Sequence, residues 1–125
     1  PTMNATDTQV GGTHYLQMPY QPIRLITELQ MNFFQGSILK YLCRYRHKGG
    51  KEDLKKAIHY CQLAKKMGPA DECTYGTKEA GRLFRDFCRE NGAPPAIIFA
   101  LDAVLCSEWD TAEEIIDDII LHYDE

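Results

Sequence analysis

The sequence predicts an all-α fold of about six helices. Apolar residues recur at spacings of three and four along most of the chain, and no segment shows the sustained alternation of a half-buried strand. Turn-forming pairs interrupt these periodic stretches at intervals of helical length: Gly49-Gly50, Gly68-Pro69 and Asn91-Gly92. With 125 residues, of which 44% are hydrophobic, the chain is long enough to bury one core.

The N-terminal region is expected to be an extended arm or an ordered loop followed by a short helix. Residues 1–22 lack sustained periodicity and contain glycine and proline. A helix is predicted over 22–30, because Pro22 suits a first helical turn and apolar residues follow at helical spacing, namely Ile23, Ile26 and Leu29.

Two longer helices are predicted in the middle of the chain. Asn32 and Gln35 form a capping-box pattern, which predicts a helix from there to His47. After Gly49-Gly50 a further helix is expected over 51–67, with acidic residues in its first turn, where the helix dipole favours them. We expect the two helices to pack as an antiparallel hairpin.

Three helices are predicted in the C-terminal half. The first begins after the N-cap candidate Thr77 and is closed by Asn91-Gly92, and the second starts at Pro94-Pro95. Thr111 and Glu114 form a capping-box pattern that predicts the start of the last helix. The linker 68–76 divides the chain into a functional unit, 1–67, and an acidic helical accessory region, 68–125, which we expect to pack in the same domain.

Charge is distributed unevenly. The whole chain carries 14 Lys and Arg against 18 Asp and Glu, a net charge of −4, which argues against a general DNA-coating protein. Residues 40–66 hold nine basic and two acidic residues, whereas residues 101–125 hold nine acidic residues and no Lys or Arg. A compact basic segment favours binding of a small polyanion at one place. The alternative is that the two segments neutralise each other within or between subunits.

The predicted hairpin has a candidate phosphate site. On a helical projection, four polar residues fall within a sector of about 80°, and these are Ser37, Lys40, Arg44 and His47. The adjoining sector is apolar and comprises Phe34, Ile38, Tyr41, Leu42 and Tyr45. On the next helix a polar row lies beside the apolar stripe and comprises Lys55, His59, Gln62 and Lys66. If the rows converge, Arg44 offers a bidentate fork and Lys40 a point charge to a phosphate chain. The alternative is two solvated amphipathic helices.

Other motifs are weaker. Gly49-Gly50-Lys51 lacks the earlier glycine and the following Ser or Thr of a P-loop, which excludes a Walker-type kinase. His14-Tyr15 follows a glycine pair and could contact a nucleotide or anchor a loop. The histidines lack zinc-ligand spacing, so no metal site is expected.

The cysteine pattern favours reduced thiols. Five cysteines form no CxxC pair, and Cys43 and Cys61 are expected to be core thiols. No apolar stretch reaches the roughly 20 residues that span a bilayer, and no secretory signal pattern is seen, so we expect a cytoplasmic protein that does not bind a membrane.

An ordered series of motifs over residues 10–66 resembles one family. The series is Val10-Gly11-Gly12-Thr13-His14-Tyr15, Gln21-Pro22-Ile23, then Phe34 through Gly50, and Glu52 through Tyr60. It resembles the small SaV-like family of tailed phages, a family of unknown function related to the C-terminal domain of the podovirus nucleotide kinase. The positions that match the family pattern are His14, Tyr15, Gly36, Lys40, Tyr41, Arg44, Lys48, Asp53, Leu54, Lys56 and Ala57. Residues 68–125 match no part of it.

The resemblance implies a phage protein that handles nucleotides in the host cytoplasm. Its enzymatic form would be a (deoxy)nucleoside monophosphate kinase without a P-loop, which would use Mg²⁺. In that case phosphates would be held by Lys40, Arg44 and Lys48, with Ser37, Lys55, Lys56 and His59 nearby. His14 and Tyr15 would close over the nucleotide, and Asp53 would orient a basic residue or a hydrated Mg²⁺.

Two other functions stay open. One is a non-catalytic protein that sequesters a nucleotide or nucleotide signal and so counters host defence. The other is an acidic protein whose C-terminal helices occupy the DNA-binding surface of a host protein. A homo-oligomer is also expected, because Leu39 and Cys43 lie away from the main apolar sector of their helix, on a side that one chain could leave exposed. The alternative is that the C-terminal helices fold back over this side within one chain.

Overall fold

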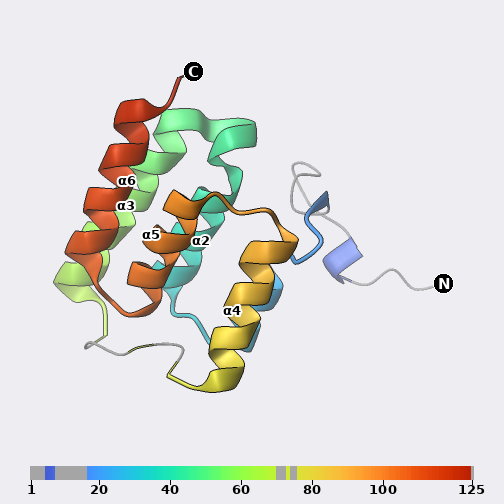
Figure 1. Ribbon diagram of the computed structural model, residues 1–125. Helices are drawn as coiled ribbons and strands as arrows, with labels where there is room; N and C mark the ends of the chain where they lie inside the picture. Colours follow the sequence, from blue (N-terminus) through green and yellow to red (C-terminus); the bar gives the residue numbers. More distant parts are fainter. Residues whose placement is uncertain (1–4, 8–16, 70–72, 74–75, 125) are drawn as a thin grey trace.

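The computed structural model describes residues 5–7, 17–69, 73 and 76–124. This part of the chain contains helices and no strand, which confirms the all-α class (Figure 1). The α-helices are α1 (Pro22–Glu28), α2 (Phe33–Arg44), α3 (Gly50–Met67), α4 (Lys78–Glu90), α5 (Pro95–Leu105) and α6 (Trp109–His122). A 3-10 turn, η1 (Ala5–Asp7), precedes them, and a π-helical turn, η3 (Tyr45–Gly49), joins α2 to α3.

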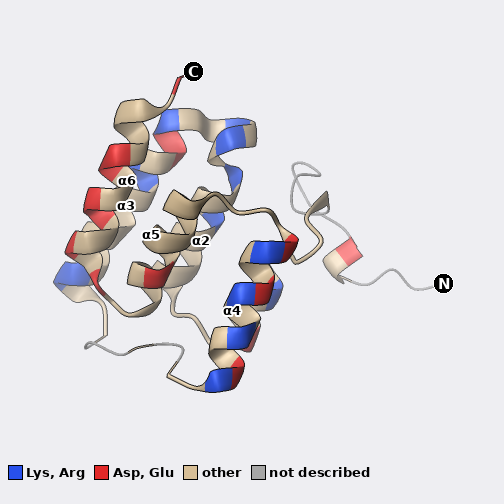
Figure 2. Ribbon diagram, viewed as in Figure 1, with Lys and Arg blue, Asp and Glu red and all other residues tan. Residues whose placement is uncertain are grey.

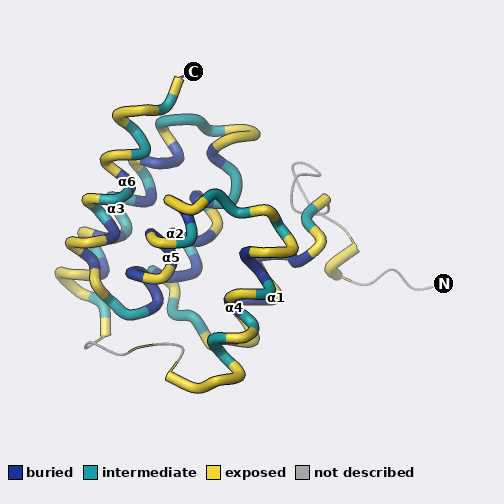
Figure 3. The backbone as a smooth tube through the Cα atoms, viewed as in Figure 1, coloured by how far each residue is buried: buried dark blue, intermediate teal, exposed yellow. Residues whose placement is uncertain are grey.

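Four helices surround the main core. Helix α3 packs against both α2 and α6, α6 packs against α5, and α5 packs back on α2 (Figure 1). Helix α1 contacts α2 and α4 beside this bundle. The inward faces of these helices are buried (Figure 3).

One core draws on both halves of the chain. Side chains that are at most 1% exposed come from every α-helix, including Leu25, Ile38, Leu54, Phe87, Leu101 and Ile116. The buried amide of Gln35 donates a hydrogen bond of 3.2 Å from Nε2 to the carbonyl oxygen of Val104 on α5. Residues 17–67 and 76–123 are therefore joined by apolar packing and by a buried polar contact.

The side of α2 that carries Leu39 is covered within the chain, as in the alternative to an oligomer. Leu39 is 0% exposed, and Gln35, one turn earlier on the same helix, is bonded to α5. Helix α5 folds back over this side of α2 within one chain. The expected homo-oligomer loses this support and stays a prediction.

The start of the hairpin matches the sequence prediction, but its turn does not. The Asn32 side chain accepts from the Gln35 amide, and the Gln35 side chain accepts from the Asn32 amide, so the capping box is present. Helix α2 ends at Arg44, however, rather than continuing to His47. The chain widens into η3, and Gly50, at φ 52°, begins α3 in the left-handed region that favours glycine.

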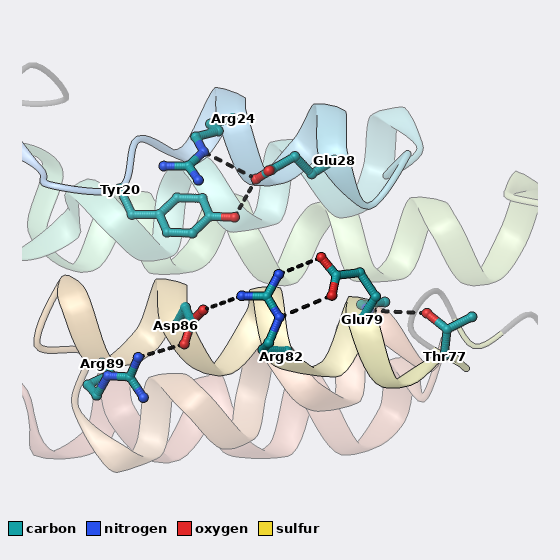
Figure 4. A network of polar contacts seen from close by, with 9 residues as sticks. Tyr20, Arg24, Glu28, Thr77, Glu79, Arg82, Asp86 and Arg89 are labelled. Carbon is teal, nitrogen blue, oxygen red and sulfur yellow. Dashed lines mark hydrogen bonds and ion pairs between the residues drawn. The ribbon is translucent and has the colours of Figure 1, made fainter.

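Helix α4 has a side-chain N-cap and ion pairs along its outer face. The Thr77 hydroxyl accepts from the Ala80 amide, which confirms the predicted N-cap. Arg82 pairs with Glu79 and Asp86, and Asp86 also pairs with Arg89 (Figure 4). These contacts at i+3 and i+4 support the outer face, while Phe84 and Phe87 are buried on the other.

The segment before α1 is attached to the end of α4. The Tyr20 amide donates to Asn91 Oδ1 over 3.1 Å, and Asn91 Nδ2 donates to the Tyr20 carbonyl oxygen over 2.7 Å. The Tyr20 ring lies edge-on to Phe87 at 5.3 Å. Its hydroxyl donates to Glu28 (Figure 4). Burial and this carboxylate raise the pKa of Tyr20 above its usual value.

The predicted capping box at Thr111 is wrong. Helix α6 already begins at Trp109, and the Ala112 amide donates to the carbonyl oxygen of Glu108 over 3.0 Å. Ser107 adopts φ 55° directly after α5, so the chain reverses within a few residues. Trp109, only 7% exposed, is thereby packed into the core as the first helical residue. Among the described helices, none combines the length and apolar character that a bilayer crossing requires.

Candidate functional site

A buried ion pair holds α2 to α3 next to η3. Arg44 donates from Nε to Asp53 Oδ2 over 2.9 Å and from Nη2 to Asp53 Oδ1 over 3.0 Å. Asp53 is 1% exposed, whereas the Arg44 side chain is 29% exposed. The guanidinium fork that the sequence offers to a phosphate is therefore engaged by a carboxylate of the same protein.

Gly49 makes room for this pair. A Cβ atom at Gly49 would lie 2.0 Å from the carboxylate carbon of Asp53, closer than any real contact. Glycine is thus required by close approach, because any larger residue would displace the carboxylate that Arg44 holds.

Aromatic rings form a row across the packed helices α2 and α3. Tyr41 and Tyr60 are stacked, with ring centroids 5.9 Å apart and an interplanar angle of 26°. Phe33 lies edge-on to Tyr60 at 5.8 Å and is 71% exposed. The two tyrosines are half-buried, so their rings are held by packing while part of each surface meets solvent.

Cations lie at one end of this row. The Arg44 guanidinium carbon is 5.3 Å from the Tyr41 ring centroid, and Lys56 Nζ is 5.7 Å from it. Both distances are within cation–π range. Lys56 also lies 3.8 Å from Glu52, an exposed pair of the kind that contributes little to stability. We call Phe33, Tyr41, Arg44, Lys56 and Tyr60 the aromatic–cationic face.

Some of the predicted site residues share this face. Lys40 is exposed and lies one turn before Arg44 on α2, and Ser37 lies one turn before Tyr41. Lys48 is exposed in η3. His14 and Tyr15 lie outside the described residues.

Lys55 and His59 point elsewhere on α3. They are exposed, and Lys55 is offset from Lys56 by about 100° around the helix axis. The row of Lys55, His59, Gln62 and Lys66 therefore runs along the outer side of α3. Only the His59 ring approaches the face, at 6.3 Å from the ring of Tyr60.

Sequence reasoning missed Phe33, Tyr41 and Tyr60 as candidate site residues, and it placed Tyr41 in the apolar sector of its helix. The signal was present for Tyr60, because it follows Lys56 by four residues and so shares its side of the helix. No local signal identifies Phe33, since its contact with Tyr60 depends on how α2 and α3 pack.

The acidic C-terminal helix lies against the basic segment within one chain. Helix α6 packs on α3, and Lys65 Nζ is 2.7 Å from Asp110 Oδ1. Figure 2 shows acidic residues along α6 and basic residues around η3 and the start of α3. Neutralisation of the two segments therefore takes place in part inside the subunit, and the aromatic–cationic face lies on the α2–α3 side.

Three cysteines are packed thiols. Cys61 and Cys88 are buried, and Cys43 is partly buried against the core, in agreement with the core role expected for Cys43 and Cys61. Burial raises the pKa of Cys43 and Cys61 to about 12 and that of Cys88 to about 11, which disfavours their reactive thiolates. In the described part of the chain no group of three His, Cys, Asp or Glu residues is placed to hold a metal ion.

Comparison with known proteins gives one match, to a family model that covers the N-terminal part of the chain. No curated protein and no solved structure matches the chain. Residues 10–62 match the model of a family described as a protein of unknown function (DUF3310), and this match includes every residue of the aromatic–cationic face.

Proposed function

We propose that the aromatic–cationic face binds a nucleotide. The observation that carries the proposal is the row of three rings, Phe33, Tyr60 and Tyr41, that ends at Arg44 and Lys56. A base stacks on aromatic rings with a gain of about 1–3 kcal/mol, and phosphate oxygens accept charge-assisted hydrogen bonds from cations. The base would lie at the Phe33 end and the phosphates at the Lys56 end.

The cations have different roles in this proposal. Arg44 is held by Asp53, which balances its charge, and its guanidinium lies over the Tyr41 ring. Lys56 and Lys40 have long, exposed or half-exposed side chains on the same side and would contact the phosphates directly. The region that resembles the SaV-like phage family contains these residues, which supports a phage nucleotide-handling protein in the host cytoplasm.

The geometry favours a binder over a kinase. A kinase without a P-loop would need a carboxylate to orient Mg²⁺ or the nucleophile. Asp53, the expected carboxylate, is buried and bonded through both oxygens to Arg44. We therefore propose that the protein retains a nucleotide without turning it over, as a sequestering protein would.

Native mass spectrometry of the chain with a mixture of ribo- and deoxynucleoside mono-, di- and triphosphates tests this. We expect retention of one nucleotide, with no newly formed diphosphate in the supernatant. Inorganic pyrophosphate, which has no base, should bind more weakly. Accumulation of diphosphate would show that the protein is a kinase rather than a non-catalytic binder. Failure to retain any nucleotide would contradict both functions.

Two substitutions assign the binding to the face. Tyr60→Ala and Lys56→Ala should each raise the Kd for the retained nucleotide about 10-fold or more, as expected for losing a stacking or charge-assisted contact. Lys78→Ala removes the same charge from the exposed start of α4 and serves as the control. Equal Kd values for Lys56→Ala and Lys78→Ala would place the ligand elsewhere.

A second candidate function rests on a groove between α5 and α6. A hollow of about 480 Å³ has an apolar floor that includes Ala96, Phe99 and Ile115. Four carboxylates also line it, namely Asp102, Glu108, Glu114 and Asp118. Phe99 is 65% exposed. We propose that this groove receives a basic amphipathic helix of a host protein, in keeping with an acidic protein that occupies a DNA-binding surface.

A fluorescent helical peptide with a leucine stripe flanked by lysines tests the groove. Glu114→Lys should weaken peptide binding several-fold and reduce its salt dependence, because one attractive charge becomes repulsive. Asp124→Lys makes the same charge change after the end of α6 and should have a smaller effect. Equal effects of the two variants would show only non-specific attraction to an acidic protein.

A further inference from the structure

Two cysteines that are distant in the sequence meet at the surface. Cys73 lies in the segment between α3 and α4 and is exposed, and Cys106 follows the last residue of α5 and is partly exposed. Their Sγ atoms are 2.9 Å apart. This separation exceeds the roughly 2.05 Å of a disulfide bond by less than about 1 Å.

The pair differs from the other three cysteines. Cys43, Cys61 and Cys88 belong to helices and pack in or against the core. Cys73 and Cys106 both lie outside the helices, and neither is among the buried core residues. They can therefore approach bonding distance without displacing core side chains.

We propose that Cys73 and Cys106 are a redox modification site that forms a reversible intramolecular disulfide. The bond would connect the segment between α3 and α4 to the turn between α5 and α6. The co-reactant is a low-molecular-weight disulfide of the glutathione class, which the two thiols reduce as they are oxidised.

The reaction proceeds in two exchange steps. Cys73, the more exposed of the two, loses its thiol proton to solvent and attacks one sulfur of the small disulfide. A mixed disulfide forms and one small thiolate leaves. The Cys106 sulfur then loses its proton and attacks Cys73 Sγ, which breaks the mixed disulfide and releases the second small thiolate.

The balance of the two steps is complete. Two protein thiols and one small disulfide become one protein disulfide and two small thiols. Burial raises the pKa of Cys106 to about 12, and the neighbouring Cys73 contributes in the same direction. Exposure assigns the encounter with the oxidant to Cys73, and the 2.9 Å between the two Sγ atoms assigns the resolving step to Cys106.

The disulfide would close a loop that contains α4 and α5. Such a loop restricts the unfolded chain, so the oxidised protein should melt about 5–15 °C above the reduced protein. The turn that contains Cys106 leads directly into α6. Oxidation would thus fix how α6 and the segment before α4 are placed relative to each other.

The test is to equilibrate the full chain in buffers of increasing oxidised to reduced glutathione ratio, alkylate it with N-ethylmaleimide in denaturant, so that the buried thiols also react, and measure its mass. The number of alkylated thiols should fall from five to three with no retained glutathione, and dithiothreitol should restore five. Proteolysis should then yield one linked peptide pair that contains Cys73 and Cys106.

Single substitutions separate this pair from the other thiols. Cys73→Ser and Cys106→Ser should both abolish the two-thiol loss and the rise in Tm, and Cys73→Ser changes a side chain that is exposed. Cys43→Ala should keep both. Five alkylated thiols at the most oxidising ratio, a glutathione adduct that persists on the wild-type chain, or a linked peptide that contains another cysteine would each overturn the proposal.

Discussion

Replacing Arg44 by alanine should lower the free energy of unfolding by about 3–5 kcal/mol. The reason is that Asp53 is 1% exposed and accepts two hydrogen bonds from Arg44, at 2.9 and 3.0 Å. Without Arg44, a carboxylate buried beside Gly49 has lost its counter-charge. Urea unfolding followed by circular dichroism measures the loss.

Two further variants identify the cause. Lys40→Ala removes an exposed cation one turn earlier on the same helix and should change stability by no more than about 0.5 kcal/mol. Arg44→Met combined with Asp53→Leu removes both charges and should lose less than Arg44→Ala, because no unpaired charge is left buried. An Arg44→Ala unfolding curve that coincides with that of Lys40→Ala would contradict the structural role of the pair.

Replacing Ile38 by alanine should cost about 2–5 kcal/mol. Ile38 is 0% exposed at the centre of α2, so its truncation leaves a cavity among packed neighbours. Ile23→Ala is the matched control, because it deletes the same atoms from a side chain that is 54% exposed on α1. Thermal melting should place Ile38→Ala well below both the parent and Ile23→Ala. Equal melting temperatures would mean that the buried face of α2 is assigned wrongly.

Local signals in the sequence were sufficient for most of the helices. The capping box of Asn32 and Gln35 and the N-cap Thr77 form hydrogen bonds with backbone groups three residues away. Gly92 adopts a positive φ directly after the end of α4. Such contacts depend on residues that are three or four positions apart, so the sequence is enough to predict them. The apolar sector was predicted for the same reason: Ile38 and Leu42 of α2 and Tyr45 of η3 are buried, whereas Phe34 and Tyr41 are half-buried.

The errors occurred where packing competes with a local signal. Thr111 and Glu114 have the pattern of a capping box, but burial of Trp109 and the sharp turn at Ser107 begin α6 earlier. Leu39 lies outside the main apolar sector of its helix, yet α5 covers it. Neither outcome can be predicted from neighbouring residues, because each depends on a segment that is distant in the sequence.

The candidate site divides in the same way. The sequence by itself determined that a basic helical hairpin carries Lys40, Arg44 and Lys56, because charge and helical period depend only on residue order. The resemblance implied that Asp53 orients a basic residue or Mg²⁺, and only the tertiary structure decided that its partner is Arg44, since a buried carboxylate needs a counter-charge within reach. It also decided that Tyr60 of α3 stacks on Tyr41 of α2 and that Cys73 meets Cys106, because such contacts form only when the packed core brings separate segments together.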